Sequence, residues 1–595
     1  MNILTKKSSL LFSARTSTAR FYRTTARKTI SNKSKVFLAG SALCCGGIGF
    51  SWYESDTEAR HVASAIHRMS IATNIGVSVA VDYKLTQSKN YDSEEERVKA
   101  KRQCDQRCAE RVLIGLQKLG GIYVKLGQHV SAMTYILPIE WTSTLAALQD
   151  RCDPTSIEDI EKLFISDFGL PLDQVFEEFD WKPLGVASLA QVHKARLKKE
   201  HSNSNGDWVA VKFQHPRLDD FCKIDLQTVS FLIHTIKRIF PDFGFEWILQ
   251  EMQESLPQEM NFEHEAQNSK TLQENFTYER EHHTTALCIP KVLWAKRRIL
   301  LMEFMEGARV DDMEYMEKHN IDPSQVSTEI TEIFSKMMFL DGFVHCDPHP
   351  GNILIRPAKD PKSRFNFDVV LLDHGLYRTL TEELRTNYAH LWTSLIRGDE
   401  EGIRKYSLLV GCRPESHRLF ASLLTGREWS TISSADLSTD RTVNEISRVT
   451  GQAKGFLVRI YDILETLPRI ILLLLKTSDL LRGLDETLRT SHDKYMTYAL
   501  MGRFCAEAVW RDAKANLISR IKESPSISTT WSLIKNLLYA WWEYQSLEYG
   551  LKLYQLQSNT REKWQLLWKH SVEKKKKQEA LDRASVVDVS TKFEI

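Results

Sequence analysis

Apolar and polar positions along the chain predict helices at both ends and strands between them. Residues 36–53 carry no charge and close with Trp52 and Tyr53, a pattern that predicts a single membrane helix. Residues 54–172 show apolar positions at helical spacing between polar loops, whereas short strands are predicted from about Val175. Helical spacing returns from Thr381 onward. The apolar run Ile470–Leu475 is too short to span a bilayer, so it predicts the core of a buried helix.

The N-terminal composition indicates targeting to an organelle. No acidic residue occurs before Glu54, while Lys and Arg stand among many Ser and Thr, which is typical of a mitochondrial transit peptide at residues 1–35. The alternatives are a disordered basic tail for that stretch, and a buried hairpin or part of the presequence for residues 36–53. The positive-inside bias places the chain after Glu54 in the intermembrane space, with retention in the matrix as the alternative.

Small side chains within residues 36–53 favour self-association. They would let two membrane helices approach closely, so a homo-oligomer through this helix is expected. These residues are Gly40, Ala42, Gly46 and Gly47.

Overall composition excludes some classes of protein. With 595 residues, of which 42% are hydrophobic and 26% charged, the chain can bury at least one large core. A net charge of +2 gives no overall drive toward nucleic acid, and none is expected as a partner. The 10 cysteines form no CxxC framework. Cys104 and Cys108, four residues apart, are predicted to be two buried small side chains rather than a disulfide or a ligand set.

Candidate chemistry concentrates between His345 and Gly375. Asp347 is followed five residues later by Asn352 and an apolar strand, and a second strand ends in Asp373-His374-Gly375. Magnesium ions that bridge nucleotide phosphates take oxygen ligands from amides and carboxylates held on short turns. Asn352 and Asp373 therefore predict a metal site, beside which Asp347 would orient or deprotonate a nucleophile. The alternative is that each is an ordinary turn residue before a strand.

A zinc cluster is a second interpretation of the same stretch, with His345, Cys346 and His349 as ligands. Pro348 and Pro350 break any helix that would put both histidines on one face, so zinc is disfavoured. No Gly-Lys-Ser or Gly-Lys-Thr phosphate loop occurs in the chain, which leaves this stretch as its nucleotide-binding candidate.

An alanine-rich loop precedes the strands in the middle of the chain. Gly185, Ala187, Ser188 and Ala190 occupy the place of a glycine-rich loop that covers ATP phosphates. Alanine restricts the backbone and limits how closely main-chain N–H groups approach phosphate. Nucleotide handling should therefore differ from that of an ordinary kinase.

A lysine at the end of the next strand completes this half of the predicted site. Val209–Lys212 is similar to the kinase strand whose lysine holds the nucleotide phosphates, and Glu265 on a following helix is its predicted partner. Glu259 is left for another cation. Glu303 and Met305 end a later strand like a hinge whose backbone would bind adenine.

These motifs together resemble the UbiB family of atypical kinases, also called AarF-domain-containing kinases. The resemblance covers roughly residues 120–378 and includes a K-x-G-Q motif at Lys125–Gln128. It implies an α+β, protein-kinase-like bilobal fold that binds ATP or ADP with Mg²⁺. The expected domains are a helical extension over 54–172, an N-lobe over 173–306, and a C-lobe with a helical C-terminal region over 307–595.

The resemblance also assigns a regulatory role to the extension. Lys125 and Gln128 are expected to meet the carboxylates of an E-x-D motif, which here reads Glu259-Met260-Asn261 and lacks its second carboxylate. One carboxylate neutralises only one ammonium, so the charge balance around Lys125 is left open. The targeting features resemble the mitochondrial inner-membrane branch linked to lipid and coenzyme Q homeostasis. Inner-membrane lipids, or a lipid or quinone substrate, are the expected partners.

Several residues favour a small-molecule kinase or an ATPase over a conventional protein kinase. Cys346 stands where kinases carry Arg before the catalytic Asp, and no Ala-Pro-Glu anchor follows Gly375. A catalytically weak pseudokinase scaffold is the alternative, favoured by the alanine-rich loop, Cys346 and Asn261.

The C-terminal end contains an apolar helical segment rich in aromatic residues. Packing on the domain is favoured over lying on a membrane. Its members are Trp531, Ile534, Leu537, Leu538, Tyr539, Trp541, Trp542, Tyr544 and Tyr549. The basic run Lys574–Lys577 is expected to be a solvated tail in reach of anionic lipid.

Overall fold

The computed structural model describes residues 57–131, 137–148, 154–201, 208–216, 218–240, 246–434, 463, 467–488, 494–523, 531–550 and 553. The chain divides into two compact units, Met1–His67 and Arg68–Ile595. Of the first unit only residues 57–67 are described, and they are helical. The predicted transit peptide and the predicted membrane helix at 36–53 lie outside the described residues. Within the described part, no helix combines the length and the apolar character needed to cross a membrane.

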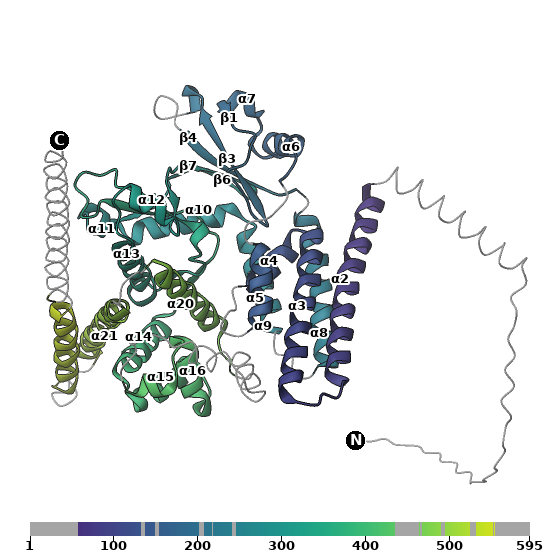
Figure 1. Ribbon diagram of the computed structural model, residues 1–595. Helices are drawn as coiled ribbons and strands as arrows, with labels where there is room; N and C mark the ends of the chain where they lie inside the picture. The colour runs from purple at the N-terminus through teal and green to yellow at the C-terminus, as the bar shows by residue number, and fades with distance from the viewer. Residues whose placement is uncertain are drawn as a thin grey trace, which may run out of the picture. The chain divides into compact units, whose positions relative to one another are not determined.

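Helices form the N-terminal part of the second unit (Figure 1). They are α2 (Thr57–Ser88), which belongs to this unit from Arg68 onward, α3 (Glu94–Leu119), α4 (Ile122–Ser131) and α5 (Ile139–Leu145). The start of α3 is set by Ser93, whose hydroxyl oxygen accepts a hydrogen bond from the Glu96 N–H at 3.1 Å. This cap satisfies one of the backbone donors that a helix N-terminus leaves unpaired.

The glycine of the K-x-G-Q motif permits the close packing of α4. A Cβ added at Gly127 would lie 2.2 Å from a methyl group of Leu148 and 2.8 Å from one of Leu116. Real side chains do not tolerate such distances, so only glycine lets α4 approach both leucines. This approach fixes where Lys125 and Gln128 lie.

An antiparallel sheet forms the core of the N-lobe. Its strands are β1 (Phe176–Phe179), β2 (Gly185–Val186), β3 (Ala190–Leu197), β4 (Trp208–Gln214), β6 (Val292–Lys296) and β7 (Ile299–Glu303). They run in the order β1-β3-β4-β7-β6, with β2 paired to β3.

Both faces of this sheet are covered, so β4 is apolar almost throughout. Val211 and Phe213 pack with Phe164 of α6 (Ile157–Phe168) on one face. Ala210 packs with Phe262 of α10 (Phe262–Asn275) on the other. Because side chains alternate along a strand, Lys212 shares the face of Ala210 and is directed toward α10.

The C-lobe contains a second, smaller sheet. Its order is β5 (Leu287–Cys288), β11 (Phe367–Leu371), β10 (Ile353–Pro357) and β8 (Ala308–Arg309). A separate antiparallel pair joins β9 (Phe343–His345) to β12 (Tyr377–Thr379). The loops that carry the candidate site residues leave from the ends of β9, β10 and β11.

Helices make up the rest of the described C-lobe (Figure 1). They include α13 (Pro323–Ser335), which runs into a π-helix over Lys336–Asp341, and then α14 (Glu382–Arg397), α15 (Glu400–Leu409), α16 (His417–Thr425), α20 (Arg469–Leu488) and α21 (Lys494–Glu523). Two further helices connect the lobes to the extension, α8 (Leu218–Ile239) and α9 (Glu246–Glu259). The prediction of a buried helix over the run Ile470–Leu475 is confirmed, because Ile471 to Leu475 are buried in α20.

The expectation that the aromatic C-terminal segment packs into the core is wrong for most of its large side chains. Residues 531–550 are helical, but Trp531 and Trp542 are 71% and 68% exposed, and Leu538, Tyr539, Trp541 and Tyr549 are exposed as well. Helical spacing alone gave no signal of which face has a partner, because an aromatic stripe fits a core or a membrane interface equally well.

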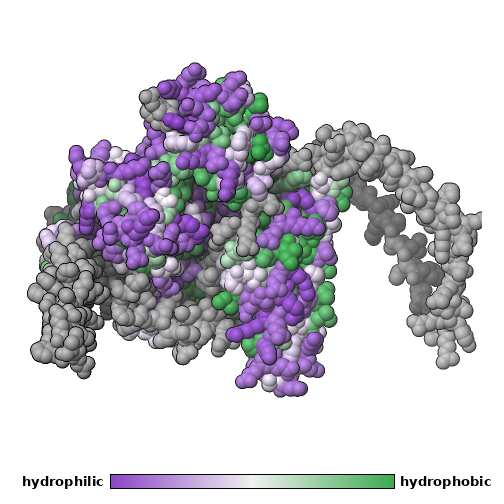
Figure 2. All heavy atoms as spheres, turned by 45° about the horizontal axis from the view of Figure 1, so that its top comes forward, coloured by the Kyte–Doolittle hydropathy of each residue, from purple (hydrophilic) through white to green (hydrophobic). Residues whose placement is uncertain are grey.

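A second exposed apolar stripe lies on α2. Met69, Val77, Val81 and Leu85 are exposed and recur every four or eight residues, which puts them on one helix face. Figure 2 shows hydrophobic residues along the edge of the molecule where α2 lies in Figure 1.

Candidate functional site

Lys212 and Glu265 form a buried ion pair between β4 and α10. The Lys212 ammonium lies 2.8 Å from each carboxylate oxygen of Glu265 and 3.6 Å from Oδ1 of Asp373. It also lies 5.0 Å from the centre of the Phe262 ring. Burial acts to lower the pKa of Lys212, but the charges of Asp373 and Glu265 outweigh it and raise the pKa. The lysine is therefore a fixed cation beside Asp373.

The antiparallel register of β10 and β11 brings Asn352 and Asp373 to the same end of the C-lobe sheet. Ile353 pairs with Leu371, and the Leu372 N–H donates to the Asn352 carbonyl at 3.0 Å. Asp373 accepts the Gly375 N–H at 2.9 Å on Oδ1. Burial opposes ionisation of Asp373, yet Lys212 and this backbone donor hold its pKa well below the ordinary value.

Oxygen donors in this arrangement fit a hard cation. The Asn352 side-chain NH₂ donates to the Asp347 carbonyl at 3.2 Å, while its amide oxygen accepts no hydrogen bond from any described residue. The Asp373 side chain is ionised and 43% exposed, which leaves room around its carboxylate. An amide oxygen and a carboxylate from adjacent turns are the ligand types that Mg²⁺ takes. These two residues would therefore hold the metal.

His345 connects the turn of Asp347 to that of Asp373. Its Nε2 lies 2.7 Å from the Asp373 carbonyl, and its Nδ1 accepts the Asp347 N–H at 3.1 Å. Burial lowers the pKa of His345, which is consistent with a neutral ring that donates through Nε2. Both ring nitrogens are in use, and Cys346 is fully buried with its thiol 3.4 Å from the Val344 carbonyl. The zinc interpretation does not fit this geometry.

Asp347 lies in a strongly positive environment. Burial acts against its ionisation, but Lys476, His349 and Lys125 together hold its pKa far below the ordinary value. Lys476 is the nearest of these, with its ammonium 2.9 Å from Oδ1 of Asp347. Asp347 is therefore a carboxylate that can accept a hydrogen bond from a nucleophile.

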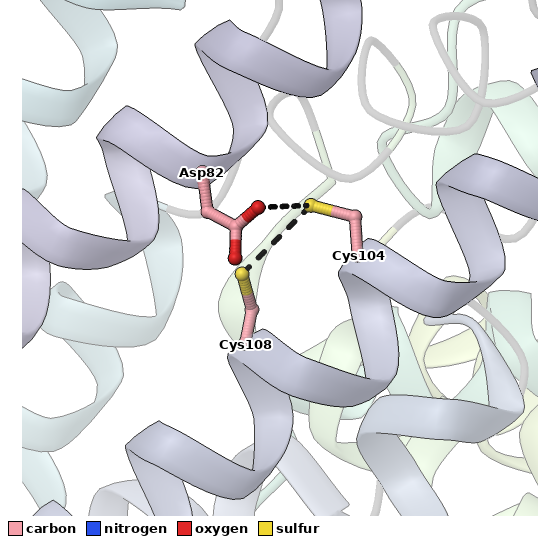
Figure 3. Close-up of side chains that lie close together, drawn as sticks. All are labelled: Asp82, Cys104 and Cys108. Carbon is pink, nitrogen blue, oxygen red and sulfur yellow. Dashed lines mark hydrogen bonds between the residues drawn. The ribbon is translucent and has the colours of Figure 1, made fainter.

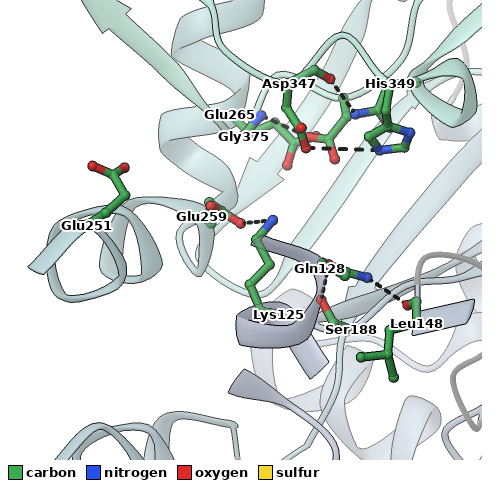
Figure 4. Close-up of polar contacts among 12 residues, drawn as sticks. Lys125, Gln128, Leu148, Ser188, Glu251, Glu259, Glu265, Asp347, His349 and Gly375 are labelled. Atoms are coloured by element: carbon green, nitrogen blue, oxygen red, sulfur yellow. Dashed lines mark hydrogen bonds and ion pairs between the residues drawn. The ribbon is translucent and has the colours of Figure 1, made fainter. Parts of the chain in front are cut away.

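In Figure 4 the Lys125 side chain of α4 points toward Glu259, and Gln128 lies beside Ser188 and Leu148. Lys125 reaches Oε2 of Glu259 at 2.6 Å, and Gln128 donates to the Leu148 carbonyl at 3.0 Å. The charges of Glu259, Asp347 and Asp373 raise the pKa of Lys125 despite its burial. Lys125 therefore lies within electrostatic reach of both Asp347 and Asp373.

Asn261 does not take part in this charge balance. Its side-chain oxygen accepts the Glu263 N–H at 3.1 Å, so it is the N-cap of α10. Asn and Asp cap helices about equally well. Because Asp347 and Asp373 supply the additional negative charge near Lys125, the missing carboxylate of the E-x-D motif does not leave Lys125 unbalanced.

The alanine-rich loop is joined to the extension. The Ser188 hydroxyl donates to Gln128 Oε1 at 3.4 Å, and the Ala187 N–H donates to the Ala190 carbonyl at 2.8 Å. His215 contacts the Ala187 carbonyl through Nε2 at 2.9 Å. A Cβ at Gly185 would meet nothing within 4 Å. The loop is thus held by its own bonds and by Gln128, not by glycine conformations.

The predicted hinge lies between the two sheets. Glu303 is the last residue of β7, and Met305 is buried, with its sulfur 3.2 Å from a guanidinium nitrogen of Arg356. The Met305 N–H donates to no described residue, which leaves it for a ligand. Gly307 has a φ of +158° and lies against the Ile355 carbonyl, where a Cβ would come within 2.9 Å.

Lys476 is the site residue that the sequence motifs missed. It lies in α20, 129 residues from Asp347, and beyond every motif. The available signal was a lysine directly after the apolar run Ile470–Leu475, because a lysine in a buried helix requires a counter-charge.

A second polar cluster lies between α2 and α3 (Figure 3). Cys104 Sγ is 3.7 Å from Asp82 Oδ1 and 3.9 Å from Cys108 Sγ. Both thiols are buried and free, as predicted. Arg107 and Arg111 each bind the Asp82 carboxylate at 2.8 Å. Two guanidinium groups are thus already bound to the carboxylate that would have to ligate a metal.

The two lobes and the site between them define a protein-kinase-like protein. Residues 147–407 match the ABC1 atypical kinase-like domain. The chain is 44% identical over 441 residues to "ABC1 family protein MCP2 homolog" of Schizosaccharomyces pombe, which covers 73% of this chain and 78% of that protein. It belongs to the ABC1, or AarF-domain, family, and the resemblance inferred from its motifs is confirmed.

Two further relatives, from yeast and frog, support the same assignment. "ABC1 family protein MCP2" of Saccharomyces cerevisiae is 37% identical over 84% of this chain and 89% of its own length. "AarF domain-containing protein kinase 1" of Xenopus laevis is 36% identical over 82% and 89%. Among solved structures, a complex of Rv3197 with erythromycin from Mycobacterium tuberculosis matches with a TM-score of 0.38 and 18% identity, over 66% of this chain and 98% of that chain.

Proposed function

We propose that this protein binds ATP with Mg²⁺ and transfers its terminal phosphoryl group to a small molecule or to water. The observation that carries the proposal is the convergence of four side chains from separate elements. The ammonium of Lys212 lies against Glu265 and Asp373, and the β10–β11 register places Asn352 beside the Asp373 turn. Side chains of this kind neutralise phosphate charge in phosphoryl transfer.

Each residue has a definite task in this proposal. Lys212 binds nucleotide phosphate and is oriented by Glu265, while the Met305 N–H, which has no described acceptor, would donate to the adenine ring. Asn352 and Asp373 would hold Mg²⁺, which lowers the charge on the phosphate oxygens when bound. Asp347 is ionised and fixed by His345, so it orients the attacking hydroxyl or water and takes its proton once the new bond to phosphorus has made that proton acidic.

The two helices beside Asp347 favour a small molecule as the phosphoryl acceptor. Helices α4 and α20 contribute Lys125 and Lys476 beside this carboxylate. A protein kinase must admit an extended peptide next to its catalytic Asp, and these helices would compete with it. A lipid or quinone headgroup, or water, needs less space. A conventional protein kinase is therefore the least favoured activity.

We place this activity at the mitochondrial inner membrane, in lipid or coenzyme Q homeostasis. The basic N-terminal composition and the apolar stretch 36–53 support targeting and anchoring. The exposed stripe of α2, which follows that stretch in the chain, supports nearness to lipid, as do the exposed tryptophans of residues 531–550. The proposed arrangement is single-pass, with residues after Glu54 in the intermembrane space.

A non-catalytic scaffold is the second candidate. Lys125 is within electrostatic reach of Asp347 and Asp373, and Gln128 is bonded to the alanine-rich loop, so the extension occupies space next to the proposed phosphate site. In this case nucleotide would bind without turnover.

Nucleotide binding and hydrolysis by the purified full-length chain test the proposal. Asp373→Asn should abolish Mg²⁺-dependent turnover and weaken Mg²⁺-dependent binding. Asp360→Asn is the matched control, because Asp360 is also about half exposed and ion-paired, but to His283 outside the site. Equal behaviour of Asp373→Asn and wild type would rule out the enzyme. Binding by wild type without any turnover would favour the scaffold.

A further inference from the structure

Lys476 comes to the site from outside the domain that defines the family. The matched domain ends at residue 407, whereas Lys476 lies in α20, the helix Arg469–Leu488. Its neighbours on the N-terminal side, Ile471 to Leu475, are buried, and its own side chain is 12% exposed. A burial of this kind is costly for an ammonium unless it is paired, and its partner is Asp347 at 2.9 Å.

The pair with Asp347 does not use all the N–H donors of Lys476. An ammonium has three N–H donors, and Asp347 is the one described group to which Lys476 donates. Lys212 is directed to both oxygens of Glu265, and Lys125 to Glu259. Lys476 is thus the lysine bound to the proposed base, with N–H groups left for a further acceptor.

His129 also has a polar atom without a hydrogen-bond partner. His129 of α4 is 6% exposed, and its Nε2 has no hydrogen-bond partner. Burial, together with the charges of Lys476 and Lys125, lowers its pKa. Buried polar atoms without partners are uncommon, and here one lies within electrostatic reach of Lys476, Lys125 and Asp347. The unpartnered Nε2 of His129 therefore marks a polar position near Asp347 that no described residue satisfies.

Phosphoryl transfer places an acceptor at this position. The nucleophile must lie about 3–3.5 Å from the phosphorus it attacks, with its proton toward the base. A group hydrogen-bonded to the base is then within reach of the oxygens of the transferring phosphate. Cys346 contributes no charge there, although kinases carry an arginine at that position.

We propose that Lys476 is a phosphate-binding residue that contacts the outermost phosphate of a bound nucleoside triphosphate, with Asp347 as its partner when nucleotide is absent. This inference rests on the proposed function, because it assumes that nucleotide binds between the lobes. It assigns a part of the phosphate site to a helix that the family domain does not include.

The test compares affinities for Mg²⁺-ADP and for a non-hydrolysable Mg²⁺-ATP analogue, measured with the purified full-length chain. Removing Lys476 alone would leave Asp347 buried and unpaired, so the comparison is made in the Asp347→Asn background. Lys476→Met in that background should weaken binding of the analogue by about tenfold or more, since a charge-assisted hydrogen bond to phosphate is lost. ADP affinity should stay within about twofold, since its phosphates do not reach Lys476.

A structural role for Lys476 predicts a different result. If Lys476 serves only to attach α20, both nucleotides should be affected equally or not at all, and either outcome overturns the inference. Arg469→Gln is the matched control, because Arg469 also joins α20 to another element, through Glu254 of α9, away from Asp347. It should change neither affinity. A wild-type chain that binds neither nucleotide would overturn the proposed function itself, which separates the two failures.

Discussion

Lys125 of the K-x-G-Q motif lies 2.6 Å from Oε2 of Glu259, the first residue of the altered E-x-D motif. The other oxygen of Glu259 is buried and has no hydrogen-bond partner. The pair therefore joins α4 to the end of α9. If one partner is removed, little water reaches the other to solvate its charge.

We expect Lys125→Met to destabilise the fold by about 3 kcal/mol, because it leaves a buried carboxylate without its cation. Denaturant unfolding of the full-length chain measures this. The double variant Lys125→Met, Glu259→Gln should recover more than half of the loss. Arg418→Met is the control, since the Arg418–Glu400 pair is exposed on both sides and should contribute less than about 1 kcal/mol. Equal effects at Lys125 and Arg418 would contradict the structural role of the pair.

Gly127→Ala should destabilise by roughly 1–3 kcal/mol, because its Cβ would overlap Leu148 and Leu116. Adding Leu148→Ala should relieve part of the overlap, so the double variant should lose less than the two single losses combined. Gly185→Ala is the matched control, since nothing lies within 4 Å of its added Cβ. Thermal unfolding of the two single variants, the double variant and the control checks this, and an unchanged Gly127→Ala would show that α4 packs differently.

Asn261→Asp should leave nucleotide affinity and stability close to wild type. Either side chain caps α10 by accepting the Glu263 N–H, and the charge near Lys125 comes from other carboxylates. Asn261→Ala should instead cost about 1 kcal/mol through loss of the cap. A large gain or loss of nucleotide affinity in Asn261→Asp would mean that the second motif position does act on Lys125.

Stability should fall with rising pH because of Glu329. Burial raises the pKa of Glu329 to about 7 from an ordinary 4.5, while Thr285 and the Ala286 N–H, both bonded to Oε1, oppose the shift. The folded state then holds a proton that the unfolded state releases above pH 4.5. Stability is lost as the pH rises through 7, on the order of 3 kcal/mol.

Glu329→Gln provides the check on this pH dependence. An amide oxygen can accept both bonds that Oε1 accepts, so the variant should fold normally. Denaturant unfolding at pH 5 and pH 8 should show a smaller difference for the variant than for wild type. The same pH difference in both proteins would mean that Glu329 is ionised at pH 5.

Short motifs predicted the parts of the site that depend on local geometry. Asn352 and Asp373 lie at one end of a two-strand unit, because antiparallel pairing converts their sequence spacing into proximity. The expected pair of Lys212 and Glu265 is present at 2.8 Å, since side chains alternate along β4 and Lys212 shares the face that packs on α10. Their roles in catalysis stay predictions.

Long-range packing explains what sequence reasoning missed. Lys476 reaches Asp347 only because α20 packs against the C-lobe, and helical spacing does not say which helices meet. The exposed face of residues 531–550 was misjudged for the same reason: an apolar face indicates burial against something, but not against what. The targeting segment and the membrane helix lie outside the described residues and stay predictions.

The central claim is that Asn352 and Asp373 share one magnesium ion at a bound nucleotide. Titration of the full-length chain with an ATP analogue, with and without Mg²⁺, measures how much affinity the ion adds in wild type, Asn352→Ala, Asp373→Asn and the double variant. Ligands of one ion are coupled, so the double variant should lose little more than Asp373→Asn alone. Losses that simply add, or a Mg²⁺ effect that survives in the double variant, would contradict the claim.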